Sequence, residues 1–301
     1  MIYPFKWAGN KKKLLSVIQE IYKTSNCNKI IEPFCGSAVF SLNTEAKSYE
    51  ISDINIDLID LWLNLKNNWL QIFEFISEIN IQKIKEDQQS YILLRENYNK
   101  CNKGYIKSAL LFVLLGCCTN NLGRWNGSGE FNQTWGSRKA EVLKYLTEEL
   151  RLKITQENFK IFRRNYNEII SEENTFTYFD PPYLLSNDCY QAKQWDEMEE
   201  QKFLNWVKTI KGKWAISNII SKNGKINKYL EEFSKDYNLI NLDKKYNAKV
   251  GGYKEGIKNE SQEVLITNFE FNNEVIIKSQ PTFTAKDFIE DNKETKSYYS
   301  E

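Results

Sequence analysis

Residues 28–42 read NKIIEPFCGSAVFSL, which is a short apolar run, a turn of small residues and a second apolar stretch. This order predicts a strand, a tight loop and a helix, the repeating unit of an open α/β sheet. The next segment, SYEISD (48–53), predicts a second strand that ends on Asp53. We therefore expect an α/β fold whose ligand site lies at the carboxyl ends of parallel strands.

The α/β pattern is interrupted after this second strand. Apolar residues at helical spacing predict one long amphipathic helix over 57–76, and helical patterns continue through 80–158. Within them lies a polar loop, TNNLGRWNGSGEFNQTWGSRK (119–139). Long structured loops are often functional. We therefore expect residues 57–158 to form an inserted, mainly helical subdomain.

The α/β pattern then resumes, so that residues 1–56 and 159–271 together should form the core. TFTYFDPPY (175–183) predicts a strand that runs into a proline-stiffened turn. Further strands are expected over 213–217, 237–242 and 262–271, and helices over 199–210 and 224–236. The polar segment 272–301 predicts a loosely packed C-terminal tail.

The chain of 301 residues contains no histidine and has a net charge of +1. The lack of histidine excludes Ser-His-Asp and Cys-His catalysis, His-ligated zinc and an imidazole base. Catalysis must therefore use carboxylates, amides, the backbone, Lys, Tyr or a cofactor. Because the net charge is nearly neutral, any contact with nucleic acid requires positive charge clustered on one face.

The six cysteines show no C-x-x-C spacing. Cys117 and Cys118 end an apolar run, 109–118, that is only about half the length of a bilayer span and predicts a buried helix. Residues 1–13 contain no apolar stretch typical of a signal peptide. We expect reduced thiols, no metal site, no membrane contact and a cytoplasmic location.

The tetrapeptide Asp180-Pro181-Pro182-Tyr183 carries the strongest chemical indication. Each proline restrains the residue before it to extended geometry, so the turn is stiff. The Asp180 carboxylate and the Pro181 carbonyl can accept hydrogen bonds from an exocyclic amine, while Tyr183 can stack on the base. Two acceptors free the nitrogen lone pair, and the carboxylate stabilises the charge that develops on methylation. The alternative is a rigid turn with a surface acid.

Three other segments predict a nucleoside-type cofactor site. Gly36 and its small neighbours allow a ligand close to the backbone at a helix N-terminus, although a tight strand–helix turn has the same composition. Asp53 lies roughly 20 residues further on, where an acid accepts ribose hydroxyls. FKWAGNK (5–11) supplies an aromatic ring and Lys11, although a solvated basic terminus fits as well. Neither the dinucleotide nor the P-loop glycine pattern is present.

In these segments the chain resembles the Dam family of DNA adenine methyltransferases, the alpha group of the D12 class. The matching stretches, in family order, are KWAGNK (6–11), EPFCGSAVF (32–40), SDINIDLI (52–59), GEFN (129–132), YFDPPYL (178–184) and QEVLITNF (262–269). Their combination is far more specific than any one motif, and it spans nearly the whole chain. The resemblance implies a Rossmann-like core that transfers a methyl group from S-adenosylmethionine (AdoMet) to adenine N6 in duplex DNA, with an inserted target-recognition domain.

The resemblance also implies roles for individual residues. Trp7 and Lys11 contact AdoMet, with Lys11 near its carboxylate, and Asp53 binds the ribose hydroxyls while Ile54 lies against the adenine. Asp180 lies between the cofactor and the target amine, and the flipped adenine stacks on Tyr183. S-adenosylhomocysteine is the implied product. The methionine part of AdoMet is lined by Pro33, Phe34, Gly36, Ser37 and Ala38.

The candidate DNA-reading residues lie in the loop 119–139. Arg124 stands where the family places a guanine-reading arginine, and arginine can bind guanine O6 and N7 together. Phosphate contact and a merely solvated surface position are the alternatives for the arginines. The other candidates are Asn120, Leu122, Asn126, Asn132 and Arg138. A basic loop before the last strand could also bind phosphate or be simply solvated, and its lysines are Lys244, Lys245, Lys249, Lys254 and Lys258.

The shared Leu122, Arg124 and GEFN favour GATC as the target. The chain departs from relatives at Thr119, where an intercalating side chain is common, and at Thr134, where proline is common. These departures leave open the recognition sequence and the way in which the displaced base is replaced. Double-stranded DNA is the expected partner, a restriction endonuclease for the same site is a further one, and we expect a monomer.

Other activities fit parts of the pattern. RNA and protein-glutamine methyltransferases also hold a planar NH₂ group in a Pro-Pro-Tyr turn, but the glutamine enzymes usually carry Asn at the position of Asp180. Cytosine-N4 methyltransferases more commonly have Ser there. A catalytically silent DNA-binding protein would not need an intact tetrapeptide. AdoMet-binding calorimetry and transfer of a labelled methyl group would separate the silent protein from an enzyme.

Overall fold

The computed structural model describes residues 1–102, 104–136, 142–186, 195–242 and 261–271. Its strands form one sheet in the order β3-β2-β1-β4-β5-β8-β7, and β6 pairs with β5. Strands β1 to β5 run parallel, whereas β8 is antiparallel to both β5 and β7. The strands are β1 (Lys29–Glu32), β2 (Ser48–Asp53), β3 (Phe159–Arg163), β4 (Thr175–Phe179), β5 (Lys213–Lys222), β6 (Lys225–Ile226), β7 (Asn238–Leu242) and β8 (Ser261–Thr267).

This strand order positions the site. In a doubly wound sheet, ligands bind beyond the carboxyl ends of the strands where the strand order reverses. Here the reversal lies between the neighbouring strands β1 and β4. Pro33 follows β1 and Asp180 follows β4. The small-residue loop and the Asp180–Tyr183 turn, both predicted as parts of a site, therefore leave the sheet side by side. The predicted α/β core is confirmed as a mixed sheet, consistent with a methyltransferase fold.

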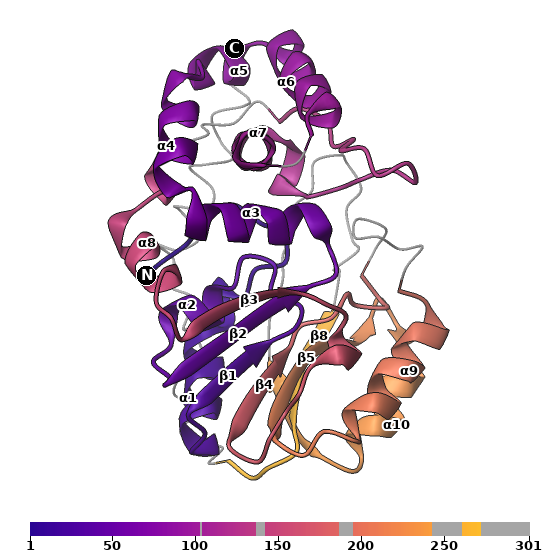
Figure 1. Cartoon of the computed structure of the whole chain (residues 1–301). Coiled ribbons are helices and arrows are strands. Elements are labelled where there is room, and N and C mark those ends of the chain that lie inside the picture. Colours follow the sequence, from indigo (N-terminus) through magenta and orange to yellow (C-terminus); the bar gives the residue numbers. More distant parts are fainter. Residues whose placement is uncertain (103, 137–141, 187–194, 243–260, 272–301) are drawn as a thin grey trace, which may run out of the picture.

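Helices cover both faces of the sheet, as Figure 1 shows. Helices α1 (Leu15–Ser25) and α2 (Val39–Asn43) pack in one apolar cluster, and α9 (Glu197–Val207) and α10 (Lys228–Ser234) pack in another. In β1, Ile30 belongs to the first cluster and its neighbour Ile31 to the second. Both strand faces are therefore buried, because successive side chains point to opposite sides.

A mainly helical region lies between β2 and β3 and rises beyond the sheet in Figure 1. Its central helix contains the apolar run of the sequence, and residues 108–117 are all buried, as predicted. Helices α3, α4, α5 and α6 pack around it. The helices are α3 (Ile56–Asn67), α4 (Trp69–Glu78), α5 (Ile81–Glu86), α6 (Gln88–Lys100), the central α7 (Tyr105–Cys117) and α8 (Glu148–Ile154), with 3-10 turns η2 (Thr119–Asn121) and η3 (Leu143–Tyr145).

Two predicted helices have different bounds in the structure. The single helix over 57–76 is wrong: Asn68 has φ −129° and ψ 37° and separates α3 from α4. The helix over 224–236 is also wrong at its start, because Asn223 and Gly224 both have positive φ and close the hairpin between β5 and β6. Asn-Gly is the strongest short hairpin signal in a sequence. Helix α10 begins only after Asn227, whose side chain accepts from Leu230 N.

The cysteines that the structure describes are all free, and Cys117 and Cys118 are buried as predicted. Within the described part of the chain, no helix has both the length and the apolar character needed to span a bilayer.

Candidate active site

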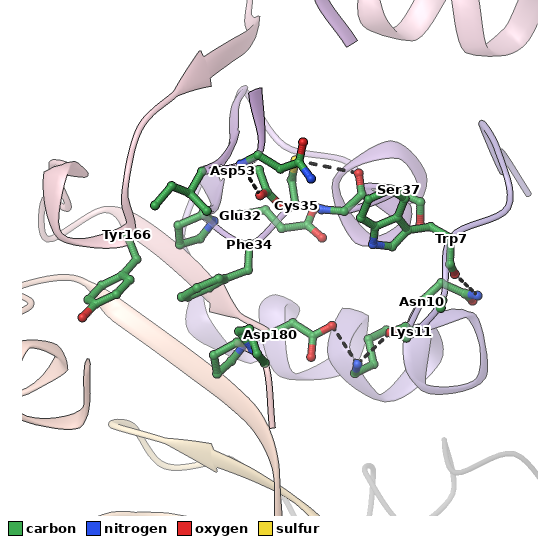
Figure 2. A pocket seen from close by; sticks show the side chains of 18 of the residues that line it. Trp7, Asn10, Lys11, Glu32, Phe34, Cys35, Ser37, Asp53, Tyr166 and Asp180 are labelled. Carbon is green, nitrogen blue, oxygen red and sulfur yellow. Dashed lines mark hydrogen bonds and ion pairs between the residues drawn. The ribbon is translucent and has the colours of Figure 1, made fainter. Parts of the chain in front are cut away.

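A cavity of ≈ 340 Å³ opens at the carboxyl ends of β1 and β4. Figure 2 shows Trp7 and Lys11 at one end of it and Tyr166 at the other, with Asp53 and Asp180 between them in this view. Most residues that were predicted from the sequence to bind the cofactor and the target base therefore line this one cavity. The lining comprises residues 7–11, 32–37, 39–40, 53–55, 123, 165–166, 180–183, 186, 195 and 199.

The loop after β1, residues 33–37, lines the cavity, and we call it the cradle. Hydrogen bonds fix its backbone. Cys35 N donates to Ser52 O at 2.9 Å, and the indole N–H of Trp62 donates to Gly36 O at 3.0 Å. Gly36 has φ +46°, and a Cβ there would lie 2.9 Å from the Trp7 ring. Only glycine allows both this conformation and this contact. Ala38 is buried at the start of α2 and is not among the lining residues, so its predicted cofactor contact stays a prediction.

Trp7 lies between the cradle and the loop after α7. A Cβ on Gly123 would lie 2.8 Å from the opposite end of the same indole ring. Ala8 N also donates to Asn121 O at 3.2 Å. The N-terminal segment therefore ties the cradle to the loop that the sequence identified as the candidate DNA reader.

Asp53 ends β2 with its carboxylate facing the cavity. Oδ1 accepts from Asn55 N at 3.0 Å and Oδ2 from Gly36 N at 3.4 Å. Burial raises the pKa of Asp53 to about 6, because a charged carboxylate loses its hydration there. Ile54 lines the cavity and is 58% exposed, so its side chain is free to lie against a flat ligand.

Asp180 is held by partners at both carboxylate oxygens. Lys11 Nζ donates to Oδ2 at 2.7 Å, and Ser217 Oγ donates to Oδ1 at 3.1 Å. Burial raises the pKa of Asp180 above its ordinary value, and the Lys11 ammonium acts in the opposite direction. Lys11 was expected to meet a cofactor carboxylate, which remains a prediction; in this structure its ammonium is paired with Asp180.

Tyr183 presents its ring to the cavity. The Lys11 ammonium lies 5.0 Å from the ring centroid, and the Tyr183 hydroxyl donates to Glu263 Oε1 at 3.2 Å. Burial raises the pKa of Tyr183 well above its ordinary value, so the hydroxyl stays protonated. Two features thus fix the position of the ring. The stiff prolines precede Tyr183 in the chain, and the Glu263 carboxylate on β8 accepts a hydrogen bond from its hydroxyl.

Glu32 is a buried lining residue that sequence reasoning missed as a site residue. Its Oε2 accepts from the Ser41 hydroxyl at 2.6 Å and from Ser41 N at 3.2 Å. Burial raises the pKa of Glu32 to about 8. The available signal was its position, because Glu32 is the last residue of β1, where ligands of such sheets bind.

Two aromatic residues of the cavity were also missed. Tyr166 stacks on Phe34 with ring centroids 5.6 Å apart, and Trp195 meets Phe34 edge-on. The Trp195 indole N–H donates to Glu200 Oε2 at 2.6 Å. Neither residue belongs to a motif, so only their meeting in space identifies them.

The candidate reader residues lie in a compact loop beside the cavity. Arg124 is exposed, and its guanidinium donates to Asn132 Oδ1 at 2.9 Å and to Asn132 O at 3.3 Å. Asn126 bonds Glu130, and Asn120 is exposed with φ 57°. The Leu122 side chain is buried, so in this conformation only its backbone could reach a groove. Outside the described residues lie Arg138 and the lysines 244, 245, 249, 254 and 258.

The fold and the cavity together indicate a class of protein. A doubly wound sheet carries the cradle and the Asp53 carboxylate beside the Asp180–Tyr183 turn. That combination is consistent with an α/β methyltransferase.

Comparison with known proteins specifies the family. The model of the D12 class N6 adenine-specific DNA methyltransferases matches residues 7–248, and the chain belongs to this family. The type II methyltransferase M.MjaIII of Methanocaldococcus jannaschii is 30% identical over 89% of this chain and 99% of its own length.

Two other relatives match over a smaller share of their length. The modification methylase StsI of Streptococcus sanguinis is 29% identical over 89% of this chain. The match covers only 43% of the length of StsI. A DNA adenine methylase of Serratia marcescens is 32% identical over 59% of this chain and 65% of its own length. The resemblance to adenine methyltransferases found in the motifs is therefore confirmed at the level of the family.

Proposed function

We propose that this chain transfers a methyl group from AdoMet to the N6 nitrogen of an adenine in double-stranded DNA, after that base has been flipped out of the duplex. The observation that carries the proposal is the shared cavity. The Asp180–Tyr183 corner faces the same space as the Gly36 cradle and Asp53. An amine site and a nucleoside site therefore adjoin, as direct transfer between two bound molecules requires.

The residues present fit AdoMet. Gly36 allows the Trp7 ring to pack against the loop backbone, where a Cβ would lie 2.9 Å from the ring, so ring and backbone together line one side of the cavity. Asp53 offers a carboxylate to ribose hydroxyls, Ile54 offers apolar surface to an adenine ring, and Phe34 lines the part proposed for the methionine chain. The other contacts that we propose come from Trp7, Lys11, Pro33, Ser37, Ala38 and Asp180. AdoMet, when bound, supplies an electrophilic methyl group.

The chain's own residues bind and polarise the target amine. Asp180 and the Pro181 carbonyl accept its two N–H groups, and Tyr183 stacks on the base. The Asp180 carboxylate then stabilises the positive charge that develops on nitrogen. Because Lys11 Nζ now bonds Oδ2 of Asp180, an incoming amine must share that oxygen with Lys11 or displace it.

DNA recognition is assigned to the helical region, 57–158, and its loop. We propose base or phosphate contacts for Asn120, Leu122, Arg124, Asn126, Asn132 and Arg138, with GATC as the favoured target. The names of two relatives, a modification methylase and a type II methyltransferase, support a role beside a restriction endonuclease. A cytoplasmic monomer is the simplest form of such an enzyme.

Expression in a host that lacks adenine methylation, followed by base-resolved mapping of modified sites, tests the proposal. We expect N6-methyladenine within one short sequence. Absence of modified adenine, or methylation of cytosine instead, would contradict it.

A matched variant tests the proposed chemistry. Asp180→Ala should reduce methyl transfer by roughly 10²-fold or more, because it removes a preorganised charge, while the fold and much of the DNA binding remain. Circular dichroism and DNA-binding titration provide the controls. Near-normal turnover by this variant would defeat the mechanism.

A further inference from the structure

Two buried hydroxyl groups lie behind the Asp180 carboxylate. Ser217 on β5 donates to Oδ1 of Asp180 at 3.1 Å, and its Oγ lies 2.8 Å from the hydroxyl oxygen of Tyr178 on β4. Ser217 is 0% exposed and Tyr178 is 1% exposed. Neither residue lines the cavity. Their hydroxyls can therefore influence a bound base only through residues that line the cavity, such as Asp180.

The register of the sheet produces this arrangement. Phe179 on β4 pairs with Ile216 on β5, so the residues that follow them, Asp180 and Ser217, are neighbours across the two strands. Tyr178 precedes Asp180 by two positions and shares its face of the sheet. Tyr178 and Ser217 are thus placed by regular strand geometry, and Asp180 follows directly on the last residue of β4.

The direction of the hydrogen bonds follows from the number of protons. An ionised carboxylate only accepts, so the single hydroxyl proton of Ser217 is donated to Asp180. The Tyr178 hydroxyl must then donate to Ser217 Oγ. The result is a directed chain from Tyr178 through Ser217 to Oδ1, in which each bond strengthens the next.

We propose that Ser217 is a positioning residue for methyl transfer: it holds Oδ1 of Asp180, so that Oδ2 faces the target amine. Tyr178 supports it by orienting the Ser217 hydroxyl. The inference rests on the proposed function. The two carboxylate oxygens already have different surroundings. Oδ2 accepts from Lys11, which lines the cavity, whereas Oδ1 accepts from the buried Ser217. Without Ser217 the carboxylate can rotate and lose its alignment.

Several other groups act on the charge of Asp180, and each must be considered in a pH measurement. Lys11 and the Ser217 hydrogen bond lower the pKa of Asp180, whereas burial and Glu263 raise it. Glu32 lies near enough to interact with the Asp180 charge, as do the hydroxyls of Tyr178 and Tyr183. Removing only the Ser217 bond should raise the pKa of Asp180 further. The acidic limb of the rate profile should then move to higher pH.

The test compares Ser217→Ala, Tyr178→Phe and the double variant in single-turnover methyl transfer across pH. Ser217→Ala should lower the rate about tenfold to a hundredfold, the size expected for one hydrogen bond to a charged group, with little change in AdoMet affinity. Tyr178→Phe should cost less, and nothing more once Ser217 is alanine. Ser217→Thr keeps the hydroxyl and should restore much of the rate.

Thr177→Val is the matched control. Thr177 is buried on β4, the strand that carries Tyr178. Its hydroxyl lies 3.4 Å from the Ser171 hydroxyl rather than near Asp180. Its rate and pH profile should equal those of the unaltered chain. A readout independent of activity is the Asp180 carboxyl titration by carbon-13 NMR in the cofactor-free protein, assigned with Asp180→Asn. Ser217→Ala should raise the titration midpoint.

Three outcomes would overturn the inference: an unchanged rate in Ser217→Ala, a lower rate with no shift of the acidic limb, or additive losses in the double variant. The unaltered chain is measured in the same assay. If it methylates adenine while Ser217→Ala performs equally well, only this inference fails. If it transfers no methyl group to DNA, the proposed function fails, and the role of Ser217 in methyl transfer fails with it.

Discussion

Three acidic side chains of the cavity, Glu32, Asp53 and Asp180, share one electrostatic environment. Burial raises the pKa of each above its ordinary value. The reason is desolvation, which disfavours the charged form of a carboxyl group. Neighbouring donors partly restore the charge: Lys11 for Asp180, and backbone N–H groups for Asp53. Protonation of these residues should therefore affect ligand binding at a pH well above that of exposed acids.

Asp53 provides a prediction at this scale. Its ionised form is the better acceptor for ribose hydroxyls, and its pKa lies at about 6. AdoMet affinity should therefore be full above pH 6 and fall as the pH drops through that value, by up to about tenfold per pH unit. Calorimetric titration across this range measures the effect. Asp53→Asn should bind more weakly with no inflection near pH 6, whereas a flat curve for the unaltered chain would contradict the prediction.

At the scale of elements, the N-terminal segment connects two loops that the sequence separates widely. The Trp7 ring contacts Gly36 in the cradle and Gly123 in the candidate reader loop. Lys11, at the end of the same segment, is paired with Asp180. One short segment thus touches the cradle, the candidate reader loop and the Asp180–Tyr183 turn.

A substitution in the reader loop should therefore weaken cofactor binding. Gly123→Ala places a methyl group 2.8 Å from the Trp7 ring and 3.0 Å from the Trp125 ring, so the Trp7 ring must shift from its place beside the cradle. We expect AdoMet affinity to fall by about tenfold, the equivalent of about 1.4 kcal/mol. Gly127→Ala is the control in the same loop, because a Cβ there meets nothing within 4 Å. Equal affinities for both variants would show that Trp7 is not the connection.

The reader loop itself is held by its own polar groups. Asn132 accepts from Arg124 through both its side chain and its backbone, and its N–H donates to Arg124 O at 3.0 Å. The guanidinium is therefore oriented by the loop itself. A preorganised arginine loses less conformational entropy when it binds a base.

Arg124→Ala should relax the choice of base at one position of the target. The expected loss is about 1–3 kcal/mol of discrimination at that position, since a bidentate contact to guanine is removed. Relative methylation rates on a panel of singly altered sites provide the measurement. Arg151→Ala, which removes an exposed arginine paired with Glu148 on α8, should leave the panel unchanged. Identical panels for Arg124→Ala and the unaltered chain would reject base reading by Arg124.

At the scale of the whole molecule, the sheet and the helical region share one core. The larger apolar cluster runs from Ile30 and Ile51 on the strands through Trp62 on α3 to the buried residues of α7. Trp62 is fully buried, packs on Phe5 and also donates to Gly36 O. Helix α3 thus belongs to the packing of both parts, although the domain boundary predicted from sequence falls at its first turn.

A shared core predicts a single cooperative unfolding transition for both parts. Trp62→Ala should lower the free energy of unfolding by about 3–5 kcal/mol and shift that one transition. Leu93→Ala, at a position that is 57% exposed on α6, should change it by about 0.5 kcal/mol or less. Scanning calorimetry compares the three proteins. Two separate transitions, only one of which responds to Trp62→Ala, would show that the parts fold independently.

The sequence by itself determined the elements whose signal is local. Strand β2 has the predicted bounds, and the cradle and the Asp180 corner were recognised because turns, strands and prolines are set by neighbouring residues. The same local signals, in family order, identified the adenine methyltransferase family. The Asn-Gly hairpin at 223–224 was also a local signal, and it was missed.

Only the tertiary structure decided which side chains surround the cavity. Ser217 and Asp180 are 37 positions apart, Tyr183 and Glu263 are 80 apart, and Lys11 and Asp180 are 169 apart. No local pattern specifies such a pair, because its two members come from segments that only the folded chain brings together. For Ser217 and Asp180 these segments are the ends of neighbouring parallel strands, which require a long connection. The chemistry of each residue can be read from the chain, but its partner depends on strand order and register, which burial of both sheet faces determines.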